Sequence, residues 1–546
     1  MITENSHAMK RYQQILLAVS SGLLLSAAWP VNGFTPLIFI AFVPLFFIQE
    51  DLGKAKNKGK GGLLFLLALL GFAIWNSLTT WWIWNSTPGG GIGAIVLNSI
   101  FMATTFWLFH FTKVQLYQNK KGNLILLFYW LSFEFLHMHW ALNWPWLNLG
   151  NVFSPYHHWI QWYEFTGAPG GTVWVLLMNI IAFKVIRSVL DWKNSSRAFS
   201  FNLILLVILW MGPVIVGEQL YRNYEESGKQ AEIIVVQPNF DPYTEQYELP
   251  ASTIIDRNLE LAASVMNKPV DFIICPESAI QEDIWLPNSH LSASIQSLKA
   301  FIGQHPETGL IIGASTFSPV SSAQEKDFAA RKFTNREGYY FAHNTAFFIE
   351  NDKPIQYYHK SRLTPGVEMM PDWFFMRPLR SLAIDLGGTI GTLKTDNERR
   401  VFLSQDTNFR LGPLICYESI FGEFASGFVR NGANLLIIIT NDGWWGNSPG
   451  HRQHMDFSIL RAIETRRSIA RSANTGISAF VDQRGDVFQA TPYWEPAVIR
   501  QQLTTNDRLT FYVKYGDYLS RIAAFVMAIF LLTAFARNQM KKGRLY

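Results

Sequence analysis

Long apolar runs separated by short polar connections occupy the first 220 positions of the chain, and one more apolar run lies near its C-terminal end. An apolar run of about 20 residues is long enough to cross a bilayer as a helix. The runs predict about eight spans, at residues 13–29, 35–49, 62–84, 92–111, 124–144, 171–188, 201–216 and 518–535. The fifth run also carries Glu134, His137 and His139, which we expect to face other helices or water.

The pattern changes after this region to short β-rich runs, at residues 231–236, 270–275, 309–315, 344–350, 411–417, 433–440 and 477–482. Helical patterns lie between them at 252–266, 291–304, 419–430 and 451–471, and polar surface loops are expected at 318–337 and 392–408. Strands that alternate with helices indicate an α/β domain. We therefore predict a helical domain over 1–220 with seven spans, an α/β domain over 221–516, and a last span with its tail over 517–546.

Basic residues predict how the spans are oriented. The connections at 30–34, 85–91 and 145–170 contain no Lys or Arg, whereas the alternate connections and both termini are basic. The basic residues are Lys10, Arg11, Lys54, Lys56, Lys58, Lys60, Lys113, Lys120, Lys121, Lys184, Arg187, Lys193, Arg197, Arg537, Lys541, Lys542 and Arg544. Because basic connections stay in the cytoplasm, both termini are predicted there and the α/β domain on the outer side. The first run has no small-residue cleavage site, so we expect it to remain as an anchor.

Composition supports a membrane protein with more than one structural unit. The chain has 546 residues, of which 49% are hydrophobic and 16% charged. That length exceeds what one hydrophobic core usually supports. The alternative, that the runs are core helices of a large soluble protein, fits the low charge and the one-sided basic residues poorly. The net charge of +5 is accounted for by the basic connections and does not indicate nucleic-acid binding.

Three reactive side chains follow probable strands in the α/β region: Glu277, Lys360 and Cys416. Taken singly, each has an ordinary interpretation as a loop acid, a solvated lysine or a packed thiol. Together they supply a base, an electrostatic clamp and a nucleophile, which are the groups that acyl transfer requires. The helix expected at 419–430 would place the thiol near a helix N-terminus, where a thiolate is stabilised.

The order of these residues resembles a known family. Cys416-Tyr417-Glu418 at the nucleophile, with Asn441-Asp442-Gly443-Trp444-Trp445-Gly446 after the next strand, is similar to the carbon–nitrogen hydrolase or nitrilase superfamily. With the predicted spans, the whole chain resembles the apolipoprotein N-acyltransferases. The resemblance implies a nitrilase-like α-β-β-α sandwich. It also implies transfer of an acyl chain from a phospholipid, through a cysteine thioester, to the α-amine of a diacylglyceryl-cysteine apolipoprotein.

The resemblance also implies a role for particular residues. Cys416 would be the nucleophile, Glu277 the general base, and Lys360 a group that holds the tetrahedral intermediate. Glu368 would support the site. Tyr417 and Glu418 match the residues beside the nucleophile, with the Tyr417 backbone N–H as a donor to the oxyanion. The enzyme would be a monomer of the bacterial inner membrane with a periplasmic catalytic domain and no cofactor.

The sequence departs from this family at three places, one of which is Trp445, where relatives more often have Phe. The family's Pro-Phe-Gly-Glu reads Pro365-Gly366-Val367-Glu368 here, and the tryptophan common after the first strand has no match, so no role is assigned to that loop. Cys275 is expected to be buried in its strand. His451 and His454 have a helix-face spacing that suits a metal, but no third ligand is evident, which favours packing or hydrogen bonding and predicts no metal.

Two other functions remain open from the sequence. One is a membrane-anchored amidase of the nitrilase type, in which water resolves the acyl-enzyme; a small soluble substrate would leave the membrane spans unexplained. The other is a lipid-binding or scaffolding protein with an inactive catalytic domain. The joint presence of the three reactive side chains disfavours this second alternative.

Overall fold

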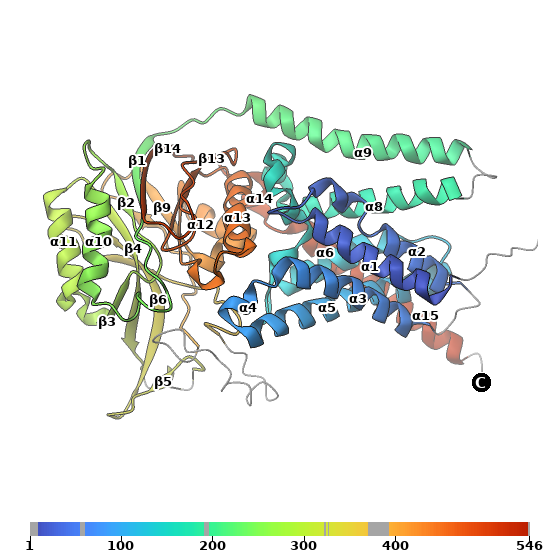
Figure 1. Ribbon diagram of the computed structural model, residues 1–546, viewed down its shortest axis with the longest axis horizontal. Coiled ribbons are helices and arrows are strands. Elements are labelled where there is room, and N and C mark those ends of the chain that lie inside the picture. The colour runs from blue at the N-terminus through green and yellow to red at the C-terminus, as the bar shows by residue number, and fades with distance from the viewer. Residues whose placement is uncertain are drawn as a thin grey trace, which may run out of the picture. The chain divides into compact units, whose positions relative to one another are not determined.

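The computed structural model describes residues 9–54, 60–190, 196–321, 324–325, 327–369 and 392–543. Of the predicted cytoplasmic basic residues, Lys56, Lys58, Lys193 and Arg544 lie outside them. The chain divides into two compact units (Figure 1). The helical unit comprises Met1–Trp84, Gly90–Arg222 and Asp517–Tyr546, and the α/β unit comprises Asn85–Gly89 and Asn223–Gly516.

Helices coincide with every predicted span. They are α1 (Arg11–Ala28), the 3-10 helix η1 (Thr35–Phe39) with α2 (Val43–Leu52), α3 (Gly61–Thr80), α5 (Pro88–Tyr117), α6 (Ile125–His137), α8 (Ala168–Leu190), α9 (Ser196–Asn223) and α15 (Tyr518–Gly543). Among the described residues, six helical segments are long and apolar enough to cross a membrane. The span at α6 is shorter, and α1 is not among the six. The count of eight spans therefore stays a prediction.

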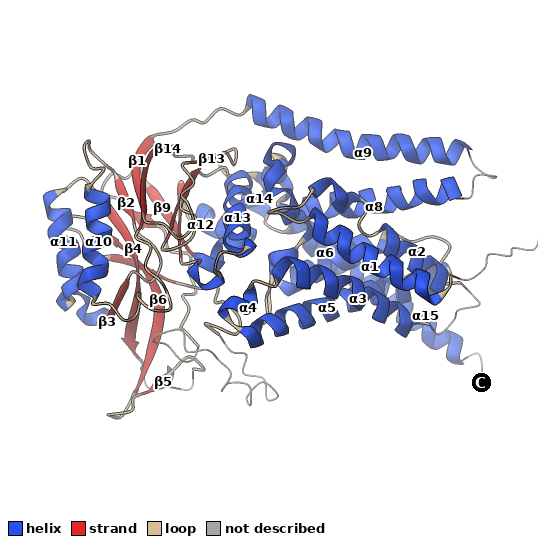
Figure 2. Ribbon diagram, in the orientation of Figure 1, coloured by secondary structure: helices blue, strands red, loops and turns tan. Residues whose placement is uncertain are grey.

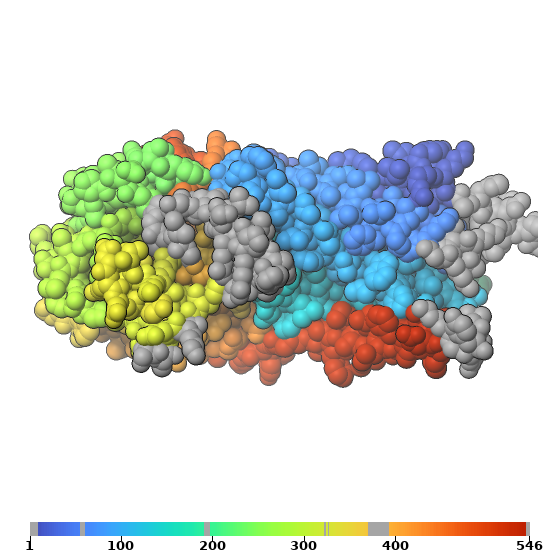
Figure 3. All heavy atoms as spheres, turned by 90° about the horizontal axis from the view of Figure 1, so that it is seen from below, coloured from blue at the N-terminus to red at the C-terminus, as the bar shows by residue number. Residues whose placement is uncertain are grey.

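Aromatic and aliphatic side chains fill the interior of the helical unit. Phe42 packs edge-on against Trp130, with ring centroids 5.0 Å apart, and Phe46 packs against Phe106 and Phe183. In contrast, α9 buries none of its most apolar window and α15 only 17%. Atoms of α15 form a continuous band on the surface of this unit (Figure 3). Apolar surface of this extent is unusual for a protein in water and suits contact with lipid.

Two polar residues of the fifth span lie between helices, as expected. Glu134 is 3% exposed, and its carboxylate accepts hydrogen bonds from Trp130 Nε1, Leu149 N and Thr172 Oγ1. His137 is likewise buried. Satisfying these groups within the unit removes the penalty of placing them in an apolar environment.

The connection at residues 145–170 is more structured than the sequence suggests. It contains the 3-10 helices η3 (Pro145–Leu147) and η4 (Leu149–Ile160) and the short helix α7 (Tyr163–Thr166). Its apolar residues Leu149, Val152 and Phe153 are fully buried. This segment is therefore part of the packed interior and not only a surface loop.

Two sheets form the centre of the α/β unit (Figure 2). The first sheet has the order β14-β1-β2-β4-β6-β5, with β3 beside β4 and β7 beside β6, and the second has the order β13-β12-β11-β10-β9-β8. The strands of the first sheet are β1 (Gln230–Gln237), β2 (Phe272–Ile274), β3 (Ile280–Trp285), β4 (Gly309–Pro319), β5 (Arg331–Lys332), β6 (Tyr339–Ile349), β7 (Gln356–His359) and β14 (Ala497–Thr504). The strands of the second sheet are β8 (Phe402–Leu403), β9 (Arg410–Ile415), β10 (Leu435–Thr440), β11 (Ile469–Ala473), β12 (Ala479–Val481) and β13 (Val487–Phe488).

Each sheet has helices on its outer face, which makes a four-layer α-β-β-α arrangement. Helices α10 (Ala251–Ala263) and α11 (Ala293–Gln304) pack Ile255, Ile295 and Leu298 against the first sheet. Helices α12 (Gly422–Arg430) and α13 (Pro449–Thr465) lie on the second sheet (Figure 2). The inner faces meet where Ser472 Oγ of β11 donates to the Val236 carbonyl of β1 at 2.7 Å. The layered sandwich expected from the buried strands is thus present.

The α/β unit corrects two sequence predictions. The helix expected over 451–471 ends at Thr465, because Arg466 adopts a left-handed conformation (φ 51°) and the chain continues into β11. The loops expected at 318–337 and 392–408 contain the short strands β5 and β8. Strands β3, β7 and β14 were also not predicted. The edge strand β14 runs antiparallel to β1 and has mixed polar and apolar residues.

Candidate active site

The three predicted reactive residues lie at strand ends of both sheets. Glu277 comes three residues after β2, Lys360 directly follows β7, and Cys416 directly follows β9. Glu277 also connects the two sheets, because its Oε2 atom accepts a hydrogen bond of 3.1 Å from the backbone N–H of Asn441, which follows β10. Residues far apart in the chain thus meet at one edge of the sandwich.

Lys360 lies between two carboxylates. Its Nζ atom is 3.1 Å from Glu277 Oε1 and 2.8 Å from Glu368 Oε1, and the side chain is 2% exposed. Burial by itself lowers the pKa of Lys360, but the charges of Glu277, Glu368 and Cys416 outweigh it and hold the pKa well above its usual value. The lysine is therefore a fixed positive charge in a site with little water.

Asn344 on β6 completes this arrangement. Its Nδ2 atom donates to Glu277 Oε1 at 2.8 Å and to Glu368 Oε1 at 3.3 Å. The two carboxylates are therefore held in place by an ammonium and an amide. Asn344 is not predicted from the sequence, because an Asn within an apolar strand carries no motif of its own.

Cys416 occupies a sharp turn between strand and helix. Its φ is 50°, in the left-handed region that a residue with a Cβ rarely adopts. The next element is a 3-10 helix, η8 (Cys416–Ile420), and α12 begins only at Gly422. The helix predicted at 419–430 therefore begins later than expected, and its dipole acts on the thiol from farther away than the sequence suggested.

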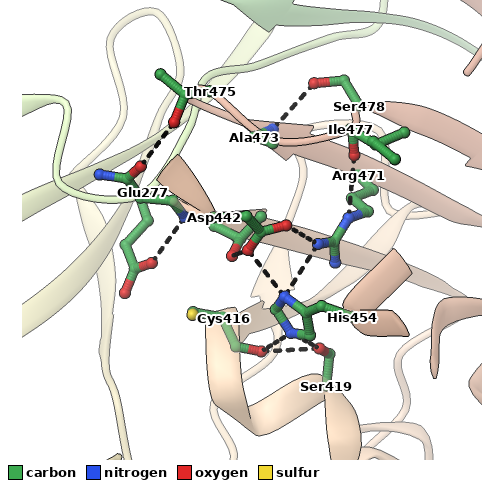
Figure 4. A network of polar contacts seen from close by, with 12 residues as sticks. Glu277, Cys416, Ser419, Asp442, His454, Arg471, Ala473, Thr475, Ile477 and Ser478 are labelled. Atoms are coloured by element: carbon green, nitrogen blue, oxygen red, sulfur yellow. Dashed lines mark hydrogen bonds and ion pairs between the residues drawn. The ribbon is translucent and has the colours of Figure 1, made fainter. Parts of the chain in front are cut away.

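The surroundings of Cys416 favour a protonated thiol at rest. Burial and the neighbouring charge of Glu277 raise the pKa of Cys416, and the opposing effect of Lys360 does not compensate. The thiolate stabilisation expected from the predicted helix N-terminus therefore does not lower the pKa of Cys416 in the resting site. A reactive thiolate here requires a base to remove the proton, and Figure 4 shows the sulfur directed to the side where the Glu277 carboxylate lies.

Glu418 joins the nucleophile turn to the segment that carries the lysine. It is fully buried, and its Oε2 atom accepts from Ile415 N at 2.8 Å. Its Oε1 atom accepts from Ser361 N at 2.6 Å and from Tyr358 Oη at 2.7 Å. Burial raises the pKa of Glu418 to about 7. Its contacts are thus with the scaffold of the site and not with Lys360.

Comparison with known proteins now identifies the family. Residues 222–508, more than half of the chain, match the carbon-nitrogen hydrolase family. The chain belongs to the carbon–nitrogen hydrolase family. Residues 21–181 match the apolipoprotein N-acyltransferase N-terminal domain, so the chain belongs to the membrane-embedded apolipoprotein N-acyltransferase branch of the superfamily.

Curated relatives match along almost their whole length. The chain is 29% identical over 535 residues to an apolipoprotein N-acyltransferase of Chlorobaculum tepidum, covering 96% of this chain and 97% of that one. It is 26% identical over 540 residues to one of Geobacter metallireducens, covering 96% of each. Among solved structures, a member of branch 10 of the nitrilase superfamily from Saccharomyces cerevisiae is 16% identical with a TM-score of 0.37, covering 51% of this chain and 91% of that chain.

The departure at residues 365–368 preserves the position of the glutamate. Gly366 has a φ of 81°, and the turn returns the chain so that Glu368 Oε2 accepts from Thr364 N at 2.9 Å. The other Glu368 oxygen faces Lys360. The turn therefore directs the carboxylate to the lysine without the phenylalanine that is usual in this branch of the carbon–nitrogen hydrolase family.

The loop after β1 also contributes to the site. Its role is not predicted from the sequence. Gln246 Oε1 accepts from Asn441 Nδ2 at 2.6 Å, and Gln246 Nε2 donates to the Ser278 carbonyl beside Glu277 at 2.9 Å. Tyr247 packs against Trp444, with ring centroids 6.2 Å apart. Burial, and then the charges of Glu277 and Glu368, raise the pKa of Tyr247, so its phenol stays protonated beside the carboxylates.

A second polar cluster lies behind Cys416 (Figure 4). Asp442 Oδ1 is 2.8 Å from His454 Nδ1, and Asp442 Oδ2 accepts from Arg471 Nη2 at 2.6 Å. Cys416, Asp442 and His454 are close enough for a shared metal ion. The positively charged Arg471 guanidinium lies beside Asp442 and would repel a cation bound there. His454 thus forms hydrogen bonds, whereas His451 is buried and stacked on Tyr493 at 3.9 Å.

The two cysteines differ in their surroundings. Cys275 is fully buried at the end of β2, as expected, and both thiols are free. Burial raises the pKa of Cys275 to about 12. Cys416 is the less buried residue of the two, and the charge of Glu277 acts on its thiol. Cys275 is therefore a packing residue.

Proposed function

We propose that this protein transfers an acyl chain from a membrane phospholipid, through a thioester on Cys416, to the N-terminal α-amine of a diacylglyceryl-cysteine apolipoprotein. The observation that carries the proposal is the Lys360 ammonium held between Glu277 and Glu368 in a chain that matches both family regions of the apolipoprotein N-acyltransferases. A buried cation beside a base and a thiol suits a reaction that develops negative charge.

In the first half-reaction, the carboxylate of Glu277 removes the proton from Cys416. The sulfur attacks the ester carbonyl of the phospholipid, and the oxyanion that forms is stabilised by Lys360 and by the backbone N–H of Tyr417. The carbon–oxygen ester bond then breaks. The lysophospholipid oxygen takes the proton back from Glu277, which leaves the acyl chain on the thiol.

In the second half-reaction, the α-amine of the acceptor attacks the thioester. Glu277 accepts a proton from the attacking nitrogen, and the carbon–sulfur bond breaks to release the amide product. The Cys416 thiol is restored when the sulfur regains a proton. Two sequential transfers through one enzyme-bound acyl group are a ping-pong mechanism.

The apolar helices support a location in the bacterial inner membrane, with the α/β unit on the periplasmic side. The connections without Lys or Arg lie on that side under the positive-inside rule. Both substrates are lipids, and their reactive ester and amine groups lie near the level of the headgroups. A catalytic unit anchored by several spans reaches those groups without extracting either lipid from the bilayer.

Acyl transfer differs from the amidase alternative in the fate of the acyl chain. We expect the purified full-length protein, given phospholipid and a diacylglyceryl-cysteine peptide, to produce equal amounts of lysophospholipid and triacylated peptide. Lysophospholipid with free fatty acid and no triacylated peptide would support a hydrolase instead. Binding of phospholipid with neither product would contradict both enzymatic functions.

A further inference from the structure

The carbonyl group of Cys416 is held on one side by two side chains. Ser419 Oγ donates to it at 2.7 Å, and His454 Nε2 lies 3.2 Å from it (Figure 4). A carbonyl oxygen can only accept, so a hydrogen bond from His454 to it needs a proton on Nε2, an atom that also lies 3.1 Å from Ser419 Oγ. Both side chains are fully buried, so these bonds do not compete with bulk water.

The other nitrogen of the His454 ring, Nδ1, also has polar partners. Nδ1 is 2.8 Å from Asp442 Oδ1 and 3.1 Å from Arg471 Nη2. An ionised carboxylate can only accept, so the contact with Asp442 requires a proton on Nδ1, and the contacts at the two ring nitrogens together are those of the imidazolium. Thr440 Oγ1 and Arg471 in turn donate to Asp442 at 2.8 Å and 2.6 Å. The ring is therefore held at both nitrogens, by Asp442 on one side and by the Cys416 carbonyl on the other.

Holding the Cys416 carbonyl also determines the direction of the next N–H group. A trans peptide is planar, and its C=O and N–H bonds point in opposite directions. The carbonyl of Cys416 and the N–H of Tyr417 belong to one such peptide. With the carbonyl directed at His454, the Tyr417 N–H points away from it.

The φ of 50° at Cys416 makes this restraint necessary. A residue with a Cβ in the left-handed region costs about 1–2 kcal/mol, so the turn would relax unless its surroundings held it. The fully buried side chains of Asp442, His454 and Arg471 restrain the turn. Asp442 follows β10, His454 lies on α13 and Arg471 lies on β11. Through His454, this cluster contacts the carbonyl of the Cys416–Tyr417 peptide.

We propose that His454 is a positioning residue that orients the Cys416–Tyr417 peptide so that the Tyr417 N–H is directed to the oxyanion. Asp442 and Arg471 act through His454 by fixing its ring. The inference rests on the proposed function only in assigning Tyr417 N–H to the oxyanion, and any acyl group transferred to Cys416 is sufficient to examine it.

Two reactions of the same thiol separate positioning from general damage. In acylation by p-nitrophenyl butyrate, the Cys416 sulfur bonds to the carbonyl carbon, the ester bond breaks, p-nitrophenolate leaves, and the thiol proton goes to Glu277. This reaction passes through an oxyanion. Alkylation by iodoacetamide displaces iodide from a saturated carbon and forms no oxyanion. A residue that orients the oxyanion donor affects the first reaction only.

The variants His454→Asn and His454→Gln differ in which contact they retain. The Asn amide replaces Nδ1 toward Asp442 but does not extend to the Cys416 carbonyl, whereas the Gln amide extends to it and can donate. Loss of one oxyanion donor costs about 100–1000-fold, so a misdirected donor should cost about 10–100-fold. We expect this loss in the acylation rate of His454→Asn, with alkylation within about threefold of wild type and substantial recovery in His454→Gln.

His451→Asn is the matched control. His451 lies one turn earlier on α13, is equally buried, and stacks on Tyr493 without a contact to Cys416. We expect this variant to retain the wild-type ratio of acylation to alkylation. A parallel fall of both rates in His454→Asn, or an unchanged ratio, would overturn the positioning role. If the wild type reacts with p-nitrophenyl butyrate but not with phospholipid, the proposed donor is wrong and the His454 inference is still decided by the ratio.

Discussion

The Glu418 carboxylate accepts a hydrogen bond of 2.6 Å from the backbone N–H of Ser361, so the second residue after the nucleophile holds the residue directly after the lysine. Through this bond, β9 and β7 bring Cys416 and Lys360 to one place although they belong to different sheets. Glu418 thus aligns two reactive groups through hydrogen bonds to the residues next to them in the chain. Its burial makes the bond strong and also makes its charge costly.

Because burial raises the pKa of Glu418, this residue makes the stability of the folded protein depend on pH. Its pKa is near 4.5 in an unfolded chain and near 7 when folded, so between these values the folded protein binds more protons. The stabilisation is therefore complete below about pH 4.5 and is lost as the pH rises through 7, by about 3 kcal/mol in total. Glu418→Gln cannot titrate. We expect the melting temperature of wild type, relative to this variant, to fall from pH 4.5 to 7.5; a constant difference would contradict the account.

Removing Lys360 should destabilise the protein as well as inactivate it. Lys360→Met leaves the buried Glu277 and the half-buried Glu368 without their cation, at a cost of about 3–5 kcal/mol. Adding Glu368→Gln removes one of the two charges and should restore part of the melting temperature but none of the acylation. Lys394→Met is the control, because Lys394 forms an ion pair with Asp327 at a half-exposed site worth at most about 1 kcal/mol. Equal losses in both lysine variants would refute the buried cluster.

Asn344 should matter through both of its hydrogen bonds. Asn344→Leu removes the donor to Glu277 and Glu368, and a bond to a charged group is worth about 1.5–3 kcal/mol, or roughly 10–100-fold in rate. Asn344→Asp adds a third carboxylate to the cluster and should slow acylation further. The rate of thioester formation measures both effects. An Asp variant faster than the Leu variant would show that the amide does not act on these carboxylates.

The turn at Cys416 predicts an unusual response to glycine. A Cβ at φ 50° costs about 1–2 kcal/mol, which glycine avoids. Cys416→Gly should therefore be at least as stable as Cys416→Ala. In Ala300→Gly, on the exposed face of α11, the same Ala-to-Gly difference should cost about 1 kcal/mol. Thermal unfolding of these variants provides the comparison, and a similar loss at both positions would show that residue 416 is not strained.

Much of the fold could be predicted from the sequence because its signals are local. Buried strands such as β10 are continuous apolar runs, and the spans are long apolar windows. Strand β11 was missed because it contains Arg471, a buried charge that only its pairing with Asp442 makes tolerable. The helix predicted before β11 is too long, because α13 ends at Thr465. The residue that ends it, Arg466, is not the glycine that usually marks a helix end in a sequence.

The sequence predicts those residues of the site that follow strand ends. Glu277, Lys360 and Cys416 carry recognisable chemistry in sequence order. Asn344 and Gln246 do not, since each acts only through contacts with residues more than 20 positions away. The thiol pKa was also mispredicted, because the sequence shows which charges are present but not how much the surrounding burial weighs against them.

The most direct test of the account is the intact mass of the full-length protein after incubation with a phospholipid that carries one defined acyl chain. The proposed mechanism predicts a gain of one acyl mass that hydroxylamine removes, and that Cys416→Ala lacks. The adduct should disappear when a diacylglyceryl-cysteine peptide is added. Phospholipid binding without any adduct, or an equal adduct on Cys416→Ala, would contradict a thioester on Cys416.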